Sequence, residues 1–95
     1  MKIVQSRSFD NKVKRFSKKQ KKVLDKQIQK IFANPSVGQE KKGDLRWVFV
    51  YKFKIETIQY LLSYRVVKNN LELIMIGPHE NYYRDLSSYL KKRKS

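Results

Sequence analysis

Four side chains of this sequence could together carry out proton transfer and bind phosphate: His79, Lys52, Lys54 and Arg65. An imidazole has an ordinary pKa of about 6.5, so it can give or take a proton at cellular pH. Cleavage of RNA without a metal needs a group that activates the ribose 2′-hydroxyl, cations that stabilise the phosphorane, and an acid that protonates the leaving oxygen. These residue types are therefore a candidate set for metal-free phosphodiester cleavage.

Each of these residues also has a purely structural interpretation. His79 follows Gly77-Pro78 and could be a turn residue. Lys52 and Lys54 could keep a strand edge soluble and protect it against edge pairing. The chemical interpretation therefore depends on whether the fold brings these side chains together.

The charge of the chain predicts a polyanionic partner. Its 95 residues include 23 Lys and Arg against 8 Asp and Glu, a formal net charge of +15. Such a surplus attracts nucleic acid, an acidic protein or an anionic membrane, and it argues against a small neutral molecule as the sole partner. Because the chain has no Cys and one His, it cannot form a disulfide scaffold or a zinc cluster, and no metal or cofactor is expected.

Length and hydropathy favour one small soluble domain over residues 1–95. Five Phe, six Tyr and one Trp are enough for one compact core. The N-terminal segment lacks the apolar stretch of a signal peptide, and no segment approaches the roughly 20 apolar residues of a membrane-spanning helix. We therefore expect a cytoplasmic protein.

The first third of the chain predicts a strand over residues 2–9 and two consecutive helices over residues 10–34. Asp10 can cap the first helix, and Ser17 with a Gln three residues later forms a capping-box pattern for the second. Apolar residues follow at helical spacing until Asn34-Pro35 ends the second helix. The outer face of this helical hairpin carries a series of cations: Lys18, Lys19, Lys21, Lys22 and Lys26.

After a polar loop, the hydropathy period changes from that of a helix to that of a strand. The alternation assigns Trp47 to the core and places Lys52 and Lys54 on the opposite face of the same strand. Asn69-Asn70 favours a tight turn between the last two strands. The loop covers residues 36–44, and the strands are expected at residues 45–54, 59–67 and 71–76.

Asn81 can cap a last helix, whose inward face would carry Tyr82, Tyr83, Leu86, Tyr89 and Leu90. The order β-α-α-β-β-β-α predicts an α+β fold, a small twisted antiparallel sheet with helices on one face. If residue 52 pairs with residue 61, one face of the sheet carries Lys52, Lys54, Leu61, Ser63 and Arg65.

Three segments carry a resemblance to a known family: GDLRWVFVYKFK, LLSYRV and IGPHENYYRDLSSYLKK. With the order of elements, they resemble the RelE/ParE superfamily of toxins from bacterial and archaeal toxin–antitoxin modules over nearly the whole chain. The resemblance implies a twisted sheet with two N-terminal helices. It also implies either ribosome-dependent mRNA cleavage, as in the RelE branch, or gyrase inhibition, as in the ParE branch. The implied partner is an antitoxin that occludes or displaces the site with an acidic or amphipathic segment.

The resemblance also implies roles for single residues. His79 occupies the position after the last strand where active members carry Arg or His. Tyr83 matches an aromatic residue that would stack a base or orient the phosphate. Lys52 and Lys54 match a Lys-x-Lys pair that supports phosphate chemistry in RelE.

Arg65 departs from the family pattern. The usual arginine stands four residues earlier, where this chain has Leu61, and Arg65 could replace it from the same face of the strand. Some relatives use a carboxylate near the lysine pair as a base, but Glu56 is more typical of a turn. Arg84 could bind phosphate or form a surface ion pair of little energetic weight with a neighbouring acid.

The remaining aromatic and basic residues have two interpretations each. Tyr82 and Tyr89 lie on a helical stripe, which favours core positions over an RNA platform. Lys18, Lys19 and Lys22 belong to a solvated helix face, and the resemblance implies that this face lies against ribosomal RNA without reading its sequence.

Three functions are compatible with the sequence. The first is a metal-independent endoribonuclease whose partners are the ribosome, mRNA and an antitoxin, with no membrane and no small-molecule ligand. The second is a ParE-like gyrase inhibitor, which would tolerate the loss of His79. The third is a basic nucleic-acid-binding module without catalysis.

Overall fold

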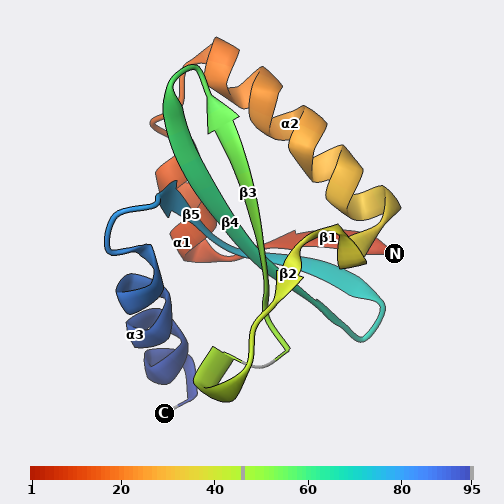
Figure 1. Cartoon of the computed structure of the whole chain (residues 1–95). Coiled ribbons are helices and arrows are strands. Elements are labelled where there is room, and N and C mark those ends of the chain that lie inside the picture. Colours follow the sequence, from red (N-terminus) through yellow and green to blue (C-terminus); the bar gives the residue numbers. More distant parts are fainter. Residues whose placement is uncertain (46, 95) are drawn as a thin grey trace.

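A five-stranded sheet organises the chain in the computed structural model, which describes residues 1–45 and 47–94 (Figure 1). The strands lie side by side in the order β1-β5-β4-β3-β2. Their bounds are β1 Lys2–Gln5, β2 Gln39–Glu40, β3 Phe49–Ile55, β4 Ile58–Val67 and β5 Asn70–Pro78. The helices are α1 Arg7–Val13, α2 Lys18–Ala33 and α3 Tyr82–Lys94, with short 3-10 turns η1 Pro35–Val37 and η2 Gly43–Leu45. The predicted α+β class is confirmed.

The sheet is mixed rather than antiparallel throughout. β1 runs parallel to β5, with Lys2 opposite Asn70 and Gln5 opposite Leu73. The other neighbouring strands are antiparallel. Hydropathy along β1 shows that a strand exists but does not show which distant strand it pairs with, so the parallel pair was not predictable from local pattern.

The first helix begins earlier than predicted. Ser6, rather than Asp10, is its N-cap: the Ser6 hydroxyl accepts the Phe9 backbone N–H at 3.1 Å and donates to the carbonyl of Ile74. The chain therefore leaves the sheet after Gln5, and Phe9 becomes a buried helical residue. Asp10 lies in the first turn, where the helix dipole favours a carboxylate.

The second helix agrees with the prediction. Ser17 accepts the Gln20 backbone N–H at 3.1 Å, and the Gln20 side chain accepts the Ser17 N–H at 2.7 Å. This capping box satisfies two of the backbone donors that every helix leaves free at its start. The helix ends at Ala33, before Asn34-Pro35.

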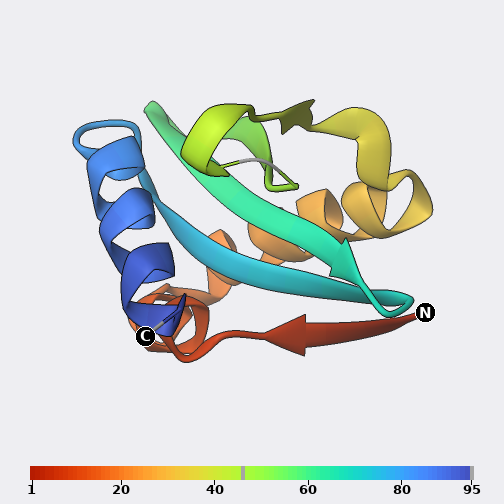
Figure 2. The same ribbon diagram turned by 90° about the horizontal axis from the view of Figure 1, so that it is seen from below.

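The helices cover both faces of the sheet, whereas the sequence predicted one face (Figures 1 and 2). α1 and α2 pack on one face over a cluster that includes Phe9, Phe16, Leu24, Ile31, Phe53, Tyr60, Leu62 and Tyr64. α3 packs on the opposite face over a second cluster, here called the α3 core: Val48, Val50, Leu61, Ile74, Tyr82 and Leu86. Neighbours such as Leu61 and Leu62 enter different clusters because successive strand side chains point to opposite faces.

Replacing Gly38 by alanine is expected to destabilise the fold. The Tyr64 hydroxyl donates to the Pro35 carbonyl at 2.6 Å and accepts the Gly38 N–H at 2.9 Å. A Cβ added at Gly38 would lie 2.5 Å from that hydroxyl oxygen. We expect Gly38→Ala to lower the free energy of unfolding by about 1–3 kcal/mol in urea denaturation. The Tyr64→Phe variant lacks the hydroxyl oxygen that would clash with the new Cβ. If Gly38→Ala lowered the free energy of unfolding equally in that background, the clash would not be its cause.

Candidate active site

The sheet brings the lysine pair and the histidine to one end of its α3 face. Lys52 pairs with Leu61, which confirms the predicted register. Lys54 lies opposite Gln59, whose carbonyl accepts the His79 backbone N–H at 3.3 Å. Adjacent strands are about 4.8 Å apart, so the backbones at Lys54 and His79 lie about 10 Å from each other. Both lysines and His79 are exposed.

The backbone of His79 is held on two sides. Its N–H donates to Gln59 of β4, and its carbonyl accepts the Tyr82 N–H at 3.2 Å. Asn81 adopts a left-handed backbone with φ 59°, a conformation that Asn tolerates better than most residues, and α3 begins directly after it. The histidine therefore stands at a defined position between the last strand and the last helix.

Three side chains form the centre of the site, here called the His79 cluster: Lys41, His79 and Tyr83. The rings of His79 and Tyr83 meet edge to face, with centroids 6.4 Å apart and an interplanar angle of 86°. The Lys41 Nζ lies over the Tyr83 ring, 4.8 Å from its centroid, in a cation–π contact. The sequence analysis missed Lys41 because its approach depends on how the segment after β2 folds against α3.

Tyr82 anchors the start of α3 in the core, as its helical spacing favoured. Its buried hydroxyl lies 2.8 Å from the Ser63 Oγ and 2.7 Å from the Met75 carbonyl oxygen. Burial, as the largest influence, raises the pKa of this hydroxyl well above its ordinary value. Tyr82 is thus a structural residue that positions its neighbour Tyr83.

Replacing Tyr82 by phenylalanine is expected to lower the free energy of unfolding by about 1–2 kcal/mol, because buried polar groups lose a hydrogen-bond partner. Since the raised pKa lets the folded chain keep a proton that the unfolded chain releases, wild-type stability should fall as the pH rises above about 10. In Tyr82→Phe the free energy of unfolding should decrease less steeply with pH. A smaller decrease should remain, because burial also raises the pKa of Tyr64. Urea denaturation at about pH 8 and about pH 11 would test both effects; an unchanged slope would contradict this account.

Arg65 lies far from the His79 cluster. It shares the α3 face but stands six residues along β4 from Gln59, a distance of about 20 Å. Its Nε lies 2.5 Å from the Glu72 Oε1 on β5. The structure therefore does not bring Arg65 together with the lysine pair and His79. Leu61, in the place of the usual arginine, is fully buried in the α3 core.

The start of α2 contacts the turn between β3 and β4, at the same end of the sheet as the lysine pair. Lys19 Nζ is 3.5 Å from the Glu56 Oε1, and both side chains are exposed. Glu56 is a turn residue with φ 58°, two positions after Lys54. Of the basic α2 residues singled out from the sequence, Lys18 and Lys19 therefore lie at this end of the sheet, and Lys22 follows one turn later; all three are exposed.

The other predicted site residues have weaker links to the cluster. The Arg84 Nε lies 3.7 Å from the Asp85 Oδ1, and because both side chains are exposed the pair has little energetic weight. Tyr89 is half-buried and packs partly against the α3 core. Packing against the α3 core favours a structural role for Tyr89. Arg84 lies at the surface, near the start of α3.

The assignment of Trp47 to the core is wrong. β3 begins only at Phe49, and Leu45 belongs to the turn η2 rather than to a strand. Trp47 has a left-handed backbone with φ 75°, and its side chain is 69% exposed. The turn breaks the strand alternation just before Val48, so Val48 rather than Trp47 enters a core.

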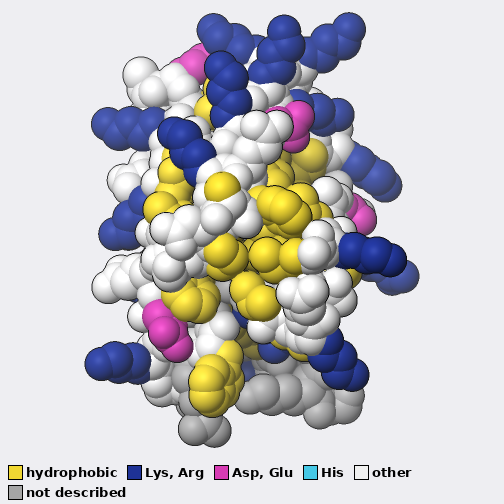
Figure 3. Space-filling model, turned by 90° about the vertical axis from the view of Figure 1, so that its right-hand side faces the viewer, with side chains coloured by type: hydrophobic (Ala, Val, Ile, Leu, Met, Phe, Trp, Pro, Cys, Tyr) yellow, Lys and Arg dark blue, Asp and Glu magenta, His cyan; other side chains and the backbone are white. Residues whose placement is uncertain are grey.

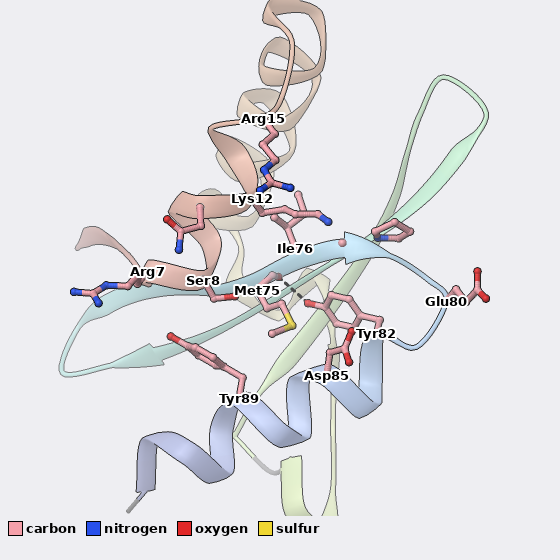
Figure 4. A pocket seen from close by; sticks show the side chains of 13 residues that line it. Arg7, Ser8, Lys12, Arg15, Met75, Ile76, Glu80, Tyr82, Asp85 and Tyr89 are labelled. Atoms are coloured by element: carbon pink, nitrogen blue, oxygen red, sulfur yellow. Dashed lines mark hydrogen bonds between the residues drawn. The ribbon is translucent and has the colours of Figure 1, made fainter.

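A groove of about 580 Å³ follows the outer edge of β5 between α1 and α3 (Figure 4). β1 pairs with β5 only as far as Leu73, so within the described chain the remainder of β5 has no strand neighbour on this side. Arg7 and Lys12 of α1 and Arg15 of the turn after it line the groove, and Asp85 of α3 lines it from the other side. The sequence analysis missed these cations because they converge only when α1 lies along β5.

The positive charge is not confined to one region. Lysine and arginine side chains surround the face seen in Figure 3, whose centre is hydrophobic. The distribution of charge therefore does not locate a binding site on this surface. Within residues 1–45 and 47–94, no group of three His, Cys, Asp or Glu side chains is placed to hold a metal ion. None of the helices described is both long enough and apolar enough to cross a membrane.

Comparisons with known proteins agree with this architecture. Residues 3–87 match a family described as ParE-like toxin of type II bacterial toxin–antitoxin system. A chain of the intact E. coli RelBE toxin–antitoxin complex is similar, with a TM-score of 0.67 and 16% identity, over 83% of this chain and 96% of that one. The isolated E. coli RelE toxin gives a TM-score of 0.66 and 18% identity, over 99% and 98% of the two chains. No curated protein sequence matches significantly. The family match covers most of the chain, which therefore belongs to the ParE-like toxins of type II bacterial toxin–antitoxin systems.

Proposed function

We propose that this toxin is a metal-independent endoribonuclease that cleaves mRNA on the ribosome. The observation that carries the proposal is the His79 cluster, in which the backbone-anchored His79 and the Lys41 ammonium each contact the Tyr83 ring. Proton transfer and charge stabilisation are the two requirements of metal-free RNA cleavage. The strand register adds two exposed lysines at the same end of the sheet.

The proposed reaction forms one bond and breaks one. The ribose 2′-oxygen attacks phosphorus as its proton is removed, and the bond to the 5′-oxygen breaks, leaving a 2′,3′-cyclic phosphate and a 5′-hydroxyl. His79 is the group suited to proton transfer in this reaction. Lys52 and Lys54 would stabilise the added negative charge, and Tyr83 would stack a base.

The remaining predicted residues receive supporting roles in this proposal. Lys18, Lys19, Lys22 and Arg84 would contact RNA phosphates without reading sequence, an interaction that salt weakens. The ion pair with Glu72 supports a structural role for Arg65 in place of a catalytic one.

A second function, gyrase inhibition of the ParE kind, is favoured by the family match, since the matched family is described as ParE-like. A toxin of this kind would act as a protein ligand and would not need His79. It remains the main alternative to RNA cleavage.

We propose a cognate antitoxin as the physiological partner. One of the similar structures is a toxin–antitoxin complex. Within the described chain, the groove along β5 offers a strand edge without a strand neighbour, and it is lined by three cations from α1 and the turn after it, which suits an acidic extended segment. Such a segment would bind beside Pro78, one residue before His79.

Induced expression of the chain in a growing bacterium would test the two functions. Growth arrest with new mRNA 5′ ends inside translated codons would support ribosome-dependent cleavage. Arrest with intact mRNA and loss of gyrase supercoiling activity would support the ParE-like alternative. Absence of arrest would contradict both and favour a binding module without toxicity.

A further inference from the structure

We infer that Trp47 is a second base-stacking platform for single-stranded RNA, on the segment that Lys41 joins to Tyr83. The inference rests on the proposed function in one respect, that an RNA strand runs past Tyr83. It assigns Trp47 to substrate binding and not to the chemical step.

Trp47 is unusually exposed and has an unfavourable backbone conformation. At 69%, its exposed fraction is the highest among the exposed large hydrophobic side chains of the described chain. Its backbone φ of 75° lies in the left-handed region, which is unfavourable for a bulky residue and occurs mostly where the structure around it enforces it. A large ring held in water on a strained backbone is unfavourable for folding, which points to a ligand.

Lys41 connects the segment that carries Trp47 to the candidate active site. The Lys41 backbone N–H donates at 2.8 Å to the carbonyl of Val48, the residue after Trp47. The Val48 N–H in turn donates to the Leu45 carbonyl at 3.1 Å, so the position of Val48 is held from both sides. The Nζ of the same Lys41 lies over the Tyr83 ring. One lysine thus links the segment that carries Trp47 to the aromatic ring of the candidate active site.

The residues around Trp47 favour RNA over a protein partner. Between residues 38 and 48, within the described chain, Trp47 is the one large hydrophobic side chain that is exposed; Leu45 is half-buried and Val48 is buried. Protein docking surfaces normally present a contiguous apolar patch, which this segment lacks. An isolated aromatic ring near lysines, here the half-buried Lys41 and the exposed Lys42, is instead the arrangement that binds single-stranded nucleic acid.

In this inference Trp47 and Tyr83 would each stack a base of the same strand. Stacking is tolerant of sequence because every base has a π-face. Loss of one stacked base typically weakens binding about 5- to 150-fold. Trp47 would therefore lower the dissociation constant of the RNA and the KM of cleavage, and leave kcat nearly unchanged.

Tryptophan fluorescence tests this directly, because Trp47 is the single Trp of the chain. The probe is a short 2′-O-methyl oligonucleotide, which lacks the nucleophilic hydroxyl and cannot be cleaved. We expect the emission of the wild-type protein to be quenched as the probe binds, and inorganic polyphosphate, which has charge but no bases, to bind without comparable quenching. Quenching by polyphosphate to the same degree, or saturated binding of the probe without quenching, would overturn the inference.

Binding of the labelled probe by fluorescence anisotropy supplies the variant test. Trp47→Asn removes the ring while tolerating the left-handed backbone, and we expect it to weaken binding about 5- to 150-fold. Trp47→Phe keeps a ring and should restore part of the affinity, whereas Ile3→Ala, an exposed apolar control on the opposite edge strand β1, should bind like wild type. Equal affinity of wild type and Trp47→Asn would refute the stacking role.

The stacking role of Trp47 and the proposed mRNA cleavage can fail independently of each other. Quenching by the probe should persist in His79→Ala, because stacking does not need proton transfer. If the probe quenches Trp47 but the toxin cleaves no mRNA in cells, the endoribonuclease proposal fails and the stacking platform stands. If an acidic antitoxin quenches Trp47 and RNA does not, the residue is a protein contact and the inference fails.

Discussion

His79→Ala is expected to abolish mRNA cleavage and the growth arrest that accompanies it. General acid–base catalysis typically contributes 10²- to 10⁴-fold, so we expect the cleavage rate to fall by about that factor. The fold should be nearly unaffected, because His79 is exposed and the hydrogen bonds that hold it, to Gln59 and from Tyr82, involve its backbone alone. The free energy of unfolding should therefore change by less than about 0.5 kcal/mol.

The measurement is induction of wild type and variant side by side, with growth curves and maps of mRNA 5′ ends. Lys2→Ala serves as a control, since it removes an exposed cation from the edge strand β1 without touching the His79 cluster. A His79→Ala variant that still arrests growth while mRNA remains intact would exclude the proposed mechanism and support gyrase inhibition. A variant that still cleaves mRNA would show that another group transfers the proton.

Leu86→Ala is expected to be the most destabilising of the substitutions considered. Leu86 is fully buried in the α3 core, where it packs with residues of β3, β4 and β5. Truncation of a buried Leu typically costs about 2–5 kcal/mol, a large part of the roughly 5–15 kcal/mol that stabilises a domain. Because α3 also carries Tyr83, loosening this helix should reduce activity even where the remainder of the fold persists.

Urea denaturation of purified protein gives the free energy of unfolding for Leu86→Ala. Leu90→Ala is the matched control: it lies one turn further along α3 and is half-buried, so its truncation should cost clearly less. If the two variants lost the same stability, the α3 core would not be what holds the helix on the sheet. Cleavage assays on both variants would then show whether the loss of activity follows the loss of stability.

Short-range patterns in the sequence determined a large part of this structure. The Ser17–Gln20 capping box lies where its spacing predicted it, because a cap depends on residues three positions apart. The pairing of Lys52 with Leu61 follows from a tight turn and a period of 2, which together leave little freedom of register. The start of α3 directly after Asn81 also follows from a short-range pattern. Within the candidate site, His79, Tyr83 and the lysine pair could be named from the sequence because they lie on such locally determined elements.

Tertiary structure alone decided the remainder. The parallel pairing of β1 with β5, the packing of α3 on the face opposite α1 and α2, and the cation–π contact of Lys41 with Tyr83 each join segments far apart in the chain. Which distant surfaces meet depends on the packing of the whole domain, and neither hydropathy period nor residue spacing carries that information. The same reason explains the two largest departures from expectation. Trp47 leaves the core because the loop before β3 turns its backbone, and Arg65 is paired with Glu72 because the β4–β5 register places them side by side.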